Sequence, residues 1–231
     1  MHIGLLQTGH MVDEIVAEMG DYPEFYSRLL NPEGLRLTAW PVVDGVFPDH
    51  VRDAEGWLIS GSRHGAYEDL DWLLPLEALI RDIYAAGVPI VGICFGHQII
   101  AKALGGTVEK YSGGWAVGRH TYDWDGEEVV LNAWHQDQIT ALPPGAEVVA
   151  SSPFCDYAAL TYGDGIFSVQ AHPEFDADAT KLLLDIRAPG VVPDDRIAAA
   201  RADLDRPTDN ARLAREIAAF FRKAKSHDQV A

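Results

Sequence analysis

Residues 90–106 read IVGICFGHQIIAKALGG, an apolar run that ends in a cysteine set between two glycines. The run begins at Val88 and is apolar at nearly every position, which indicates a strand buried on both faces, as in a parallel sheet covered by helices. A helical pattern follows from about Gly96 and ends at a Gly-Gly pair,. Cys94 therefore stands at a strand-to-helix junction, either as a small buried core residue or as a nucleophile.

The chain before this junction alternates strands with helices. Apolar runs predict strands at residues 2–8, 35–43 and 56–60,. Helical spacing predicts helices at residues 12–31, with an interruption near Gly20, and at residues 70–87,. This alternation predicts an α/β fold with a doubly wound, mostly parallel sheet flanked by helices.

The second half has a different pattern. Short strands are predicted at residues 127–134, 146–152, 156–162 and 165–171,. The turn composition YGDG at 162–165 predicts a hairpin, so a small antiparallel part is expected here,. Two helical stretches follow, the last at residues 210–227 with Thr208 or Asp209 as its cap,. No repeat or change of composition divides the chain, so we expect one domain over residues 1–231, with a frayed tail from Lys223.

Composition excludes several classes of partner. The 231 residues carry 35 Asp and Glu against 18 Lys and Arg, a formal charge of −17, which disfavours nucleic acid and anionic membranes,. No run approaches the roughly 18 apolar residues of a membrane span, and the N-terminus does not resemble a signal peptide. The two cysteines, Cys94 and Cys155, form no disulfide framework,. We therefore expect a cytoplasmic protein.

The surroundings of Cys94 favour chemistry over packing alone. Gly-x-Cys-x-Gly at this junction matches a nucleophile elbow, in which small neighbours permit a sharp turn, and the helix dipole favours a thiolate,. A cysteine nucleophile also needs a base. Among nine histidines, His172 ends a predicted strand and precedes Pro173-Glu174, so Glu174 points to the same side and can orient the imidazole,. The alternative is a strand-end histidine beside a solvated glutamate.

These motifs together resemble the class I glutamine amidotransferase family. The resemblance rests on LISGS at 58–62, GICFG at 92–96, GWAVG at 114–118, WHQDQ at 134–138 and VQAHPEF at 169–175, in family order over nearly the whole chain. It implies a flavodoxin-like fold without a cofactor or metal. It also implies a triad of Cys94, His172 and Glu174 that hydrolyses a γ-glutamyl amide through a γ-glutamyl thioester.

The resemblance also implies the residues around the triad. Backbone N–H groups of Gly61, Ser62 and Phe95 would form the oxyanion hole, although Ser62 replaces a glycine of the family pattern. Gln98, His135 and Gln136 match positions that bind the glutamine part of the substrate. His64 and Tyr67 belong to a loop similar to those of stand-alone members, which include γ-glutamyl peptidases, and could contact a leaving group larger than ammonia.

Other interpretations are weighed beside this one. The chain could supply ammonia as the glutaminase subunit of a synthase partner, or be a binding protein that has kept the fold. A zinc site from Cys94, His97 and Cys155 has no recognised spacing, and His97 is more consistent with local packing,. Asp137 or Asp176 could replace Glu174 as the carboxylate on His172.

Overall fold

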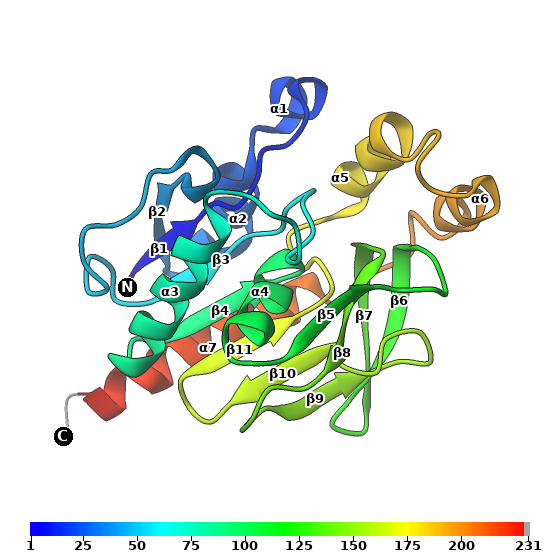
Figure 1. Cartoon of the computed structure of the whole chain (residues 1–231). Helices are drawn as coiled ribbons and strands as arrows, with labels where there is room; N and C mark the ends of the chain where they lie inside the picture. The colour runs from blue at the N-terminus through cyan, green and yellow to red at the C-terminus, as the bar shows by residue number, and fades with distance from the viewer. Residues whose placement is uncertain (229–231) are drawn as a thin grey trace.

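The parallel half of the sheet carries the carboxyl-terminal edge at which Cys94 lies. The computed structural model describes residues 1–228 and contains a nine-stranded sheet (Figure 1). Its parallel strands are, in order, β2 (Arg36–Trp40), β1 (His2–Leu6), β3 (Trp57–Ile59), β4 (Ile90–Ile93) and β11 (Ile166–Val169). The predicted doubly wound, mostly parallel sheet is confirmed for this half.

The antiparallel half continues the same sheet. Its strands are β10 (Ala159–Tyr162), β9 (Glu147–Ser151), β6 (Ala116–Trp124) and β7 (Glu127–His135). The β10–β11 pair closes through residues 163–165, which confirms the predicted hairpin. A separate two-stranded sheet joins β5 (Thr107–Lys110) to β8 (Asp137–Ala141).

Helices cover both faces of the parallel strands. They are α1 (Asp13–Met19), α2 (Tyr22–Leu30), α3 (Leu73–Ala85), α4 (Phe95–Ala103), α5 (Ala177–Leu182), α6 (Asp194–Ala202) and α7 (Asn210–Asp228). One buried cluster joins α2 and α7 to Ile3, Leu5 and Val91, and a second joins α3 and α4 to Ile59 and Ile90. Successive strand residues thus face opposite layers, which is why the central strands β3 and β4 are buried at every position,.

The regions after His172 differ in part from the sequence predictions. Helix α6 was not expected, and a π-helical turn, Leu183–Arg187, follows α5 directly. Figure 1 shows α1 and α5 on the same side of the molecule. Helix α7 continues through Asp228, so residues 223–228 belong to it, and the rest of the expected tail, 229–231, lies outside the described residues.

Asp209 stands directly before α7 at the predicted cap position, and its carbonyl accepts a hydrogen bond from the Leu213 N–H at 3.1 Å,. Its side-chain Oδ2 accepts a hydrogen bond from the backbone N–H of Val130 at 2.8 Å, and its own N–H donates to the Val130 carbonyl at 2.7 Å. Val130 lies on β7, the last strand of the sheet. Asp209 therefore joins the start of α7 to the outer edge of β7.

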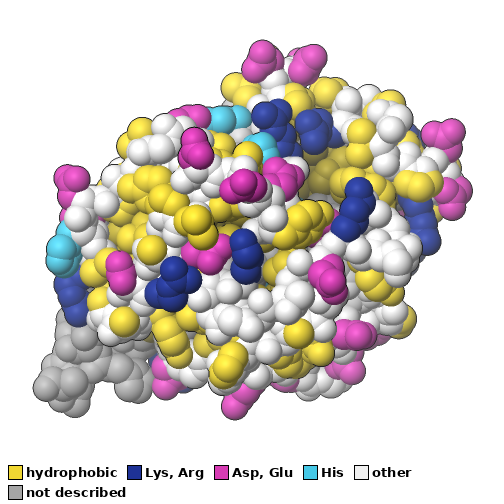
Figure 2. Space-filling view, in the orientation of Figure 1, with side chains coloured by type: hydrophobic (Ala, Val, Ile, Leu, Met, Phe, Trp, Pro, Cys, Tyr) yellow, Lys and Arg dark blue, Asp and Glu magenta, His cyan; other side chains and the backbone are white. Residues whose placement is uncertain are grey.

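Charge is distributed over the surface as the composition suggests. On the face shown in Figure 2, Lys and Arg side chains stand among acidic and apolar ones and form no broad basic surface. Within residues 1–228, no helix has the length and apolarity needed to cross a membrane.

Candidate active site

Cys94 lies at a strained turn between β4 and α4. Its backbone has φ 53° and ψ −103°, a region that a residue with a side chain seldom adopts,. Its N–H donates to the Val169 carbonyl at 2.8 Å, which fixes the turn against β11. Gly96 permits the turn because a Cβ there would lie 2.3 Å from the Ile59 carbonyl oxygen. The side chain of Cys94 is therefore held at the carboxyl ends of two parallel strands.

His172 and Glu174 form a buried hydrogen-bonded pair beyond the end of β11. His172 Nδ1 lies 2.7 Å from Glu174 Oε1, and the imidazole stacks on Phe175 with centroids 4.2 Å apart. The His172 N–H donates to the Asn132 carbonyl on β7 at 2.8 Å. Both the ring orientation and its height above the sheet are therefore fixed.

Neither alternative carboxylate reaches this histidine. Asp137 accepts a hydrogen bond from the Tyr67 hydroxyl at 3.2 Å, and Asp176 caps α5 by accepting from the Ala179 N–H at 2.9 Å. Of the three candidate carboxylates, only Glu174 contacts His172, in the geometry expected from the His-x-Glu spacing.

The charges around His172 favour its protonated form. Burial lowers the pKa of the imidazole, but the negative charges of a Cys94 thiolate and of Glu174 outweigh burial and raise it to about 10,. Nε2 is buried and has no hydrogen-bond partner within the described residues. His172 can therefore hold a proton on the nitrogen that remains free, where a leaving amine would need one.

The three expected oxyanion donors do not all remain available. The Gly61 N–H donates to the Tyr26 hydroxyl at 3.3 Å, so the structure does not support Gly61 as a donor. Within residues 1–228, the N–H groups of Ser62 and Phe95 have no acceptor. The Gly61 carbonyl accepts from the Thr8 hydroxyl at 3.0 Å, which holds the loop. Two free N–H groups thus remain near the thiol, and that number suffices for an oxyanion hole.

The residues expected to bind the substrate line one pocket with Cys94. This pocket, with a volume of about 220 Å³, includes Gln98, His135, Gln136 and Tyr67, as well as His64. Gln98 Nε2 donates to the Asp137 carbonyl at 2.8 Å and to Gln170 Oε1 at 3.0 Å, so its amide is fixed. The structure therefore brings the whole predicted set to the nucleophile.

His135 and Tyr67 offer different contacts within this pocket. Burial lowers the pKa of His135 to about 3, so the ring is neutral, and its Nε2 has no partner among the described residues. Tyr67 is 47% exposed and stands at the opening. His135 is suited to a buried polar contact with a ligand, and Tyr67 to a contact at the rim.

The other predicted thiol and imidazole are structural. His97 is fully buried and its two ring nitrogens lie 2.8 Å from Ser168 Oγ and 2.9 Å from the Tyr157 carbonyl. Burial raises the pKa of Cys155 to about 12, so its thiol stays protonated. No group of residues suited to holding a metal ion occurs in residues 1–228. The packing interpretation of His97 agrees with these contacts.

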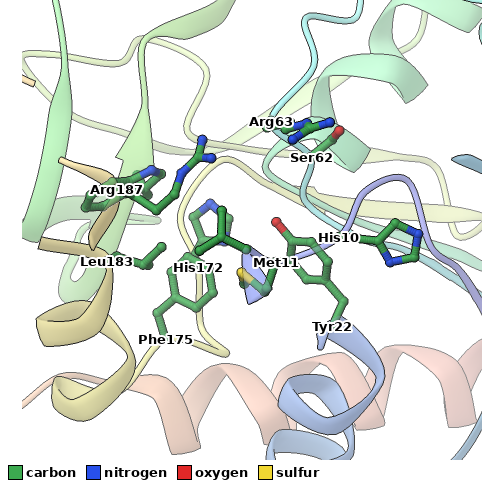
Figure 3. Close-up of a pocket in the computed structure, with 11 residues that line it drawn as sticks. His10, Met11, Tyr22, Ser62, Arg63, His172, Phe175, Leu183 and Arg187 are labelled. Carbon is green, nitrogen blue, oxygen red and sulfur yellow. The ribbon is translucent and has the colours of Figure 1, made fainter. Parts of the chain in front are cut away.

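A second pocket adjoins the first and was not expected from the sequence. Its lining includes His172 and Tyr22, and it shares Arg63, Trp134 and Arg187 with the pocket at Cys94 (Figure 3). No local motif marks these residues, because they come from separate loops and elements. The nucleophile and the histidine therefore face two connected spaces.

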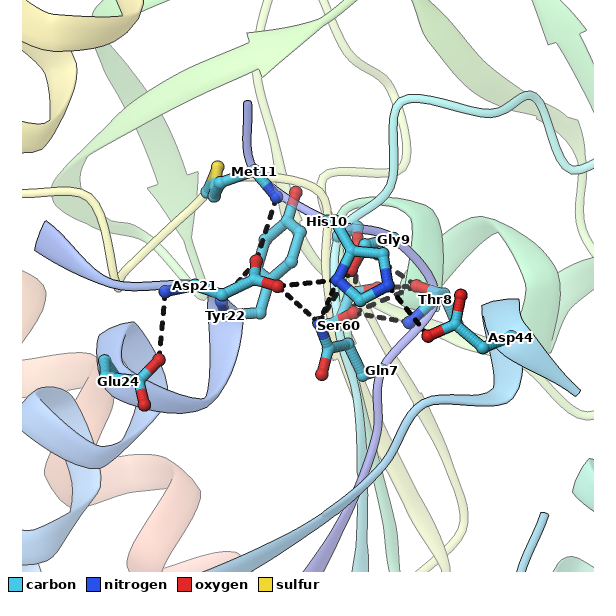
Figure 4. Close-up of polar contacts among 11 residues, drawn as sticks. Gln7, Thr8, Gly9, His10, Met11, Asp21, Tyr22, Glu24, Asp44 and Ser60 are labelled. Carbon is cyan, nitrogen blue, oxygen red and sulfur yellow. Dashed lines mark hydrogen bonds and ion pairs between the residues drawn. The ribbon is translucent and has the colours of Figure 1, made fainter. Parts of the chain in front are cut away.

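A hydrogen-bond network fixes the loop after β1 beside this second pocket. His10 Nδ1 lies 2.7 Å from Asp21 and Nε2 lies 3.0 Å from Asp44, while Gln7 Nε2 donates to Asp21 at 2.8 Å (Figure 4). Asp21 also accepts from the Met11 N–H at 2.9 Å. The wall formed by His10 and Met11 is thus held by carboxylates from two other elements.

Comparison with known proteins gives consistent results. The family model described as glutamine amidotransferase class-I matches residues 51–184. A γ-glutamyl peptidase 4 from Arabidopsis thaliana is 35% identical over 183 residues, covering 72% of this chain and 72% of that protein. A glutamine-hydrolysing GMP synthase from Bordetella parapertussis is 32% identical, covering 74% of this chain and 33% of the synthase. A crystal structure of a glutamine amidotransferase from Methylobacillus flagellatus has a TM-score of 0.72 at 24% identity, covering 96% and 94% of the two chains.

Proposed function

The chain belongs to the class I glutamine amidotransferase family, and from that membership we propose that it hydrolyses γ-glutamyl amides with Cys94 as nucleophile. The proposal rests on one observation: a strained cysteine and a histidine–glutamate pair lie in the same cleft. Cys94 stands on a strained turn, and His172 is oriented by Glu174 at 2.7 Å with its other ring nitrogen free. A nucleophile, a base and an orienting acid are the parts that acyl transfer requires.

The first step forms the γ-glutamyl thioester. The Cys94 sulfur attacks the γ-carbonyl carbon, and the N–H groups of Ser62 and Phe95 stabilise the oxyanion. The C–N bond then breaks, and the amine leaves with a proton from His172 Nε2. Because the nearby negative charges raise the pKa of His172, the imidazole carries this proton at neutral pH.

The second step releases glutamate. A water molecule attacks the thioester carbon while His172, now neutral, takes its proton. The C–S bond breaks and the Cys94 thiolate is restored beside the imidazolium. No redox step occurs, and the net reaction adds one water across the amide.

Two charged residues of the Cys94 pocket suit the amino acid head of a γ-glutamyl group. Lys110 and Asp137 are opposite residues on the β5–β8 pair and both line this pocket. Their charges complement the α-carboxylate and α-ammonium groups of a substrate. Gln98 and the neutral ring of His135 lie deeper and would contact the chain between the head and the γ-carbonyl.

A second candidate function is ammonia supply to a synthase partner. The similarity to a GMP synthase that is three times as long as the matched segment favours it, because there the matched part is joined to further chain. The two functions share both steps and differ in the leaving group. A partner protein that raises glutamine turnover by orders of magnitude would favour ammonia supply.

Substitution of Cys94 tests the proposal. Cys94→Ala should reduce hydrolysis of glutamine and of γ-glutamyl dipeptides by at least about 1000-fold, as loss of a nucleophile typically does. Cys155→Ala is the matched control, since it removes the other buried thiol and should retain activity. Activity above a few per cent in Cys94→Ala, with the fold intact by circular dichroism, would show that Cys94 is not the nucleophile.

A glutamine-like chloroketone gives an independent measurement. Mass spectrometry of the labelled protein should place the adduct on Cys94 and leave Cys155 unmodified, because burial keeps the Cys155 thiol protonated,. Equal modification of both thiols would show that the turn at Cys94 does not activate it.

A further inference from the structure

We infer that Arg63 and Arg187 form a carboxylate-binding subsite for the leaving group, so that the preferred substrates are γ-glutamyl-α-amino acids with an apolar side chain. The inference rests on the proposed hydrolysis of γ-glutamyl amides and specifies the amine that is released. Its basis is the division of the cleft and the distribution of charge in it.

The division of the cleft fixes which end of the substrate lies where. Cys94 lines the larger pocket and not the smaller, whereas His172 lines the smaller and not the larger. The sulfur bonds to the acyl carbon and His172 protonates the leaving nitrogen. The γ-glutamyl group therefore occupies the pocket at Cys94, and the leaving group extends into the pocket at His172.

Arg63 and Arg187 lie at the boundary between these pockets. Both belong to the lining of each pocket, and Figure 3 shows them on opposite sides of the opening with His172 and Tyr22 between them. The positive charge of Arg187 reaches the site, since it acts on the buried Tyr22 hydroxyl. In a γ-glutamyl-α-amino acid the free carboxylate is two bonds from the leaving nitrogen, so it falls at this boundary.

These two cations have no protein partner. Within residues 1–228, neither guanidinium has a hydrogen bond or a carboxylate in ion-pair range. The acid nearest to Arg187 along the chain is Asp185, which forms ion pairs with Lys181 at 2.8 Å and Arg201 at 2.6 Å. Unpaired arginines beside a reaction centre in a protein with a charge of −17 point to an anionic ligand group,.

His10 and the acids near the two pockets already have partners within the protein. His10 lies between Asp21 and Asp44, and the negative charge of Glu174 is directed at His172 and Tyr26. Of the acids in the larger pocket, Glu68 accepts from the Gly65 N–H, and Asp137 from Tyr67. The boundary thus has net positive charge that no side chain in the lining of the smaller pocket neutralises.

The backbone places Arg187 at this boundary by a local irregularity. Leu183–Arg187 is a π-helical turn, closed by the Ala188 N–H donating to the Leu183 carbonyl at 3.0 Å. Leu183 and Arg187 both line the pocket at His172 as a result. Such turns are rare in proteins as a whole, and those that occur are often found at functional sites.

Part of the wall of the smaller pocket is apolar. Met11, Phe175 and Leu183 line it beside the two arginines. An amino acid bound by its carboxylate would therefore direct its side chain against these residues, which favours leucine or a similar residue over a charged one. Hydrolysis of γ-glutamyl-leucine would give glutamate and leucine.

Two substrates that differ only at the carboxylate test the inference. The ratio of kcat/KM for γ-glutamyl-leucine to that for γ-glutamyl-leucinamide should be about 10 to 100, the usual effect of one or two charge-assisted hydrogen bonds. The double variant Arg63→Gln/Arg187→Gln should bring this ratio to within about threefold of unity. Arg215→Gln, which removes an exposed cation from α7, should leave the wild-type ratio. A ratio near unity in the wild type, or one unchanged in the double variant, would overturn the subsite.

The test separates this inference from the proposed function. Hydrolysis of glutamine without preference for the free carboxylate would retain the function and reject the subsite. Calorimetry on Cys94→Ala provides a readout without turnover: γ-glutamyl-leucine should bind at least about 10-fold more tightly than its amide, and the arginine variants should abolish the difference. Arginine-dependent binding in a protein that hydrolyses neither substrate would retain the subsite and reject the function.

Discussion

Tyr26 contacts two separate parts of the proposed catalytic machinery with one hydroxyl group. It donates to Glu174 Oε1 at 2.9 Å and accepts from the Gly61 N–H at 3.3 Å. The side chain is fully buried on α2, far in sequence from either partner. Tyr26 is therefore a positioning residue that couples the acid of the triad to the loop that carries Ser62.

Removal of this hydroxyl should affect both partners. Tyr26→Phe leaves the Gly61 N–H without an acceptor and Glu174 with one donor fewer, so we expect a loss of about 1–3 kcal/mol of unfolding free energy and a lower kcat. Glu174 would also lose a hydrogen bond that stabilises its negative charge beside the His172 ring, so the pH profile of kcat/KM should shift. A variant that is less stable but has the wild-type kcat and pH profile would show a purely structural role.

The turn at Cys94 and the pairing of His172 with Glu174 could be predicted from sequence because their patterns are local. A cysteine between glycines after an apolar run, and a glutamate two residues after a histidine, are short motifs with direct geometric meaning. Tyr26, Arg63 and Arg187 have no such pattern. They reach the site through the packing of α2, a loop and a π-helical turn, which one sequence does not reveal.

The predicted oxyanion donors show a related limit. Gly61 belongs to the matching loop, but the direction of its N–H depends on the rotation of one peptide unit and on the position of Tyr26. The motif identifies the loop. Only the folded structure shows that the N–H of Gly61 is already hydrogen-bonded, whereas that of Ser62 is not.

At the scale of elements, the close contact between α4 and β3 determines where the thiol lies. In Gly96→Ala the new Cβ would lie 2.3 Å from the Ile59 carbonyl oxygen, and because the obstacle is backbone the start of α4 must move. We expect a loss of several kcal/mol of unfolding free energy or, if the fold tolerates the change, at least about a 10-fold loss of kcat.

Gly87→Ala is the matched control for this prediction. Gly87 follows α3 with φ +71°, and a Cβ there meets nothing within 4 Å, so only the backbone conformation is penalised, by about 1–2 kcal/mol,. Equal losses of stability and activity in the two variants would show that the approach of α4 to β3 is not the determining contact.

The β1 loop, α2 and the turn at Asp44 are joined through His10. Its hydrogen bond to Asp21, and then the charges of Asp21 and Asp44, raise the pKa of His10 above its usual value. A group whose pKa is raised on folding adds stability below its unfolded pKa, about 6.5, and loses that contribution as the pH rises past the folded value.

The difference in unfolding free energy between wild type and His10→Gln should therefore be greater at about pH 5.5 than at about pH 9. Urea denaturation at both pH values measures it. Asp44→Asn should reduce the pH dependence, because one of the two carboxylates is removed. A difference that is the same at both pH values would contradict the assignment of the charge to His10.

The strands that are most deeply buried were also the easiest to predict from the sequence. The central strand β4 is a continuous, fully buried apolar run, and the hairpin at residues 163–165 has a clear turn composition. Strands β5, β6 and β8 were missed because their exposed residues are polar and β6 contains Gly118, so each depends on its partner strand.

At the scale of the whole molecule, alternation in sequence predicts the doubly wound half but not how the second half closes on it. The antiparallel strands extend the same sheet until β7, whose outer edge meets the segment carrying His172. The cleft therefore lies between the carboxyl ends of β4 and β11 and the edge of a strand far along the sheet. That arrangement depends on contacts between distant parts of the chain, which sequence periodicity does not encode.

The contacts along β7 have a consequence for the solubility of the folded chain. An edge strand with open hydrogen-bonding groups is a template on which a second chain can add a strand, the first event of β-aggregation. In this molecule Asp209 forms hydrogen bonds with both the N–H and the carbonyl of Val130, and the His172 N–H donates to the carbonyl of Asn132. The segment that supplies the proposed catalytic base thus also covers part of an exposed sheet edge, so its displacement would leave the Asn132 carbonyl open to strand addition by a second chain,.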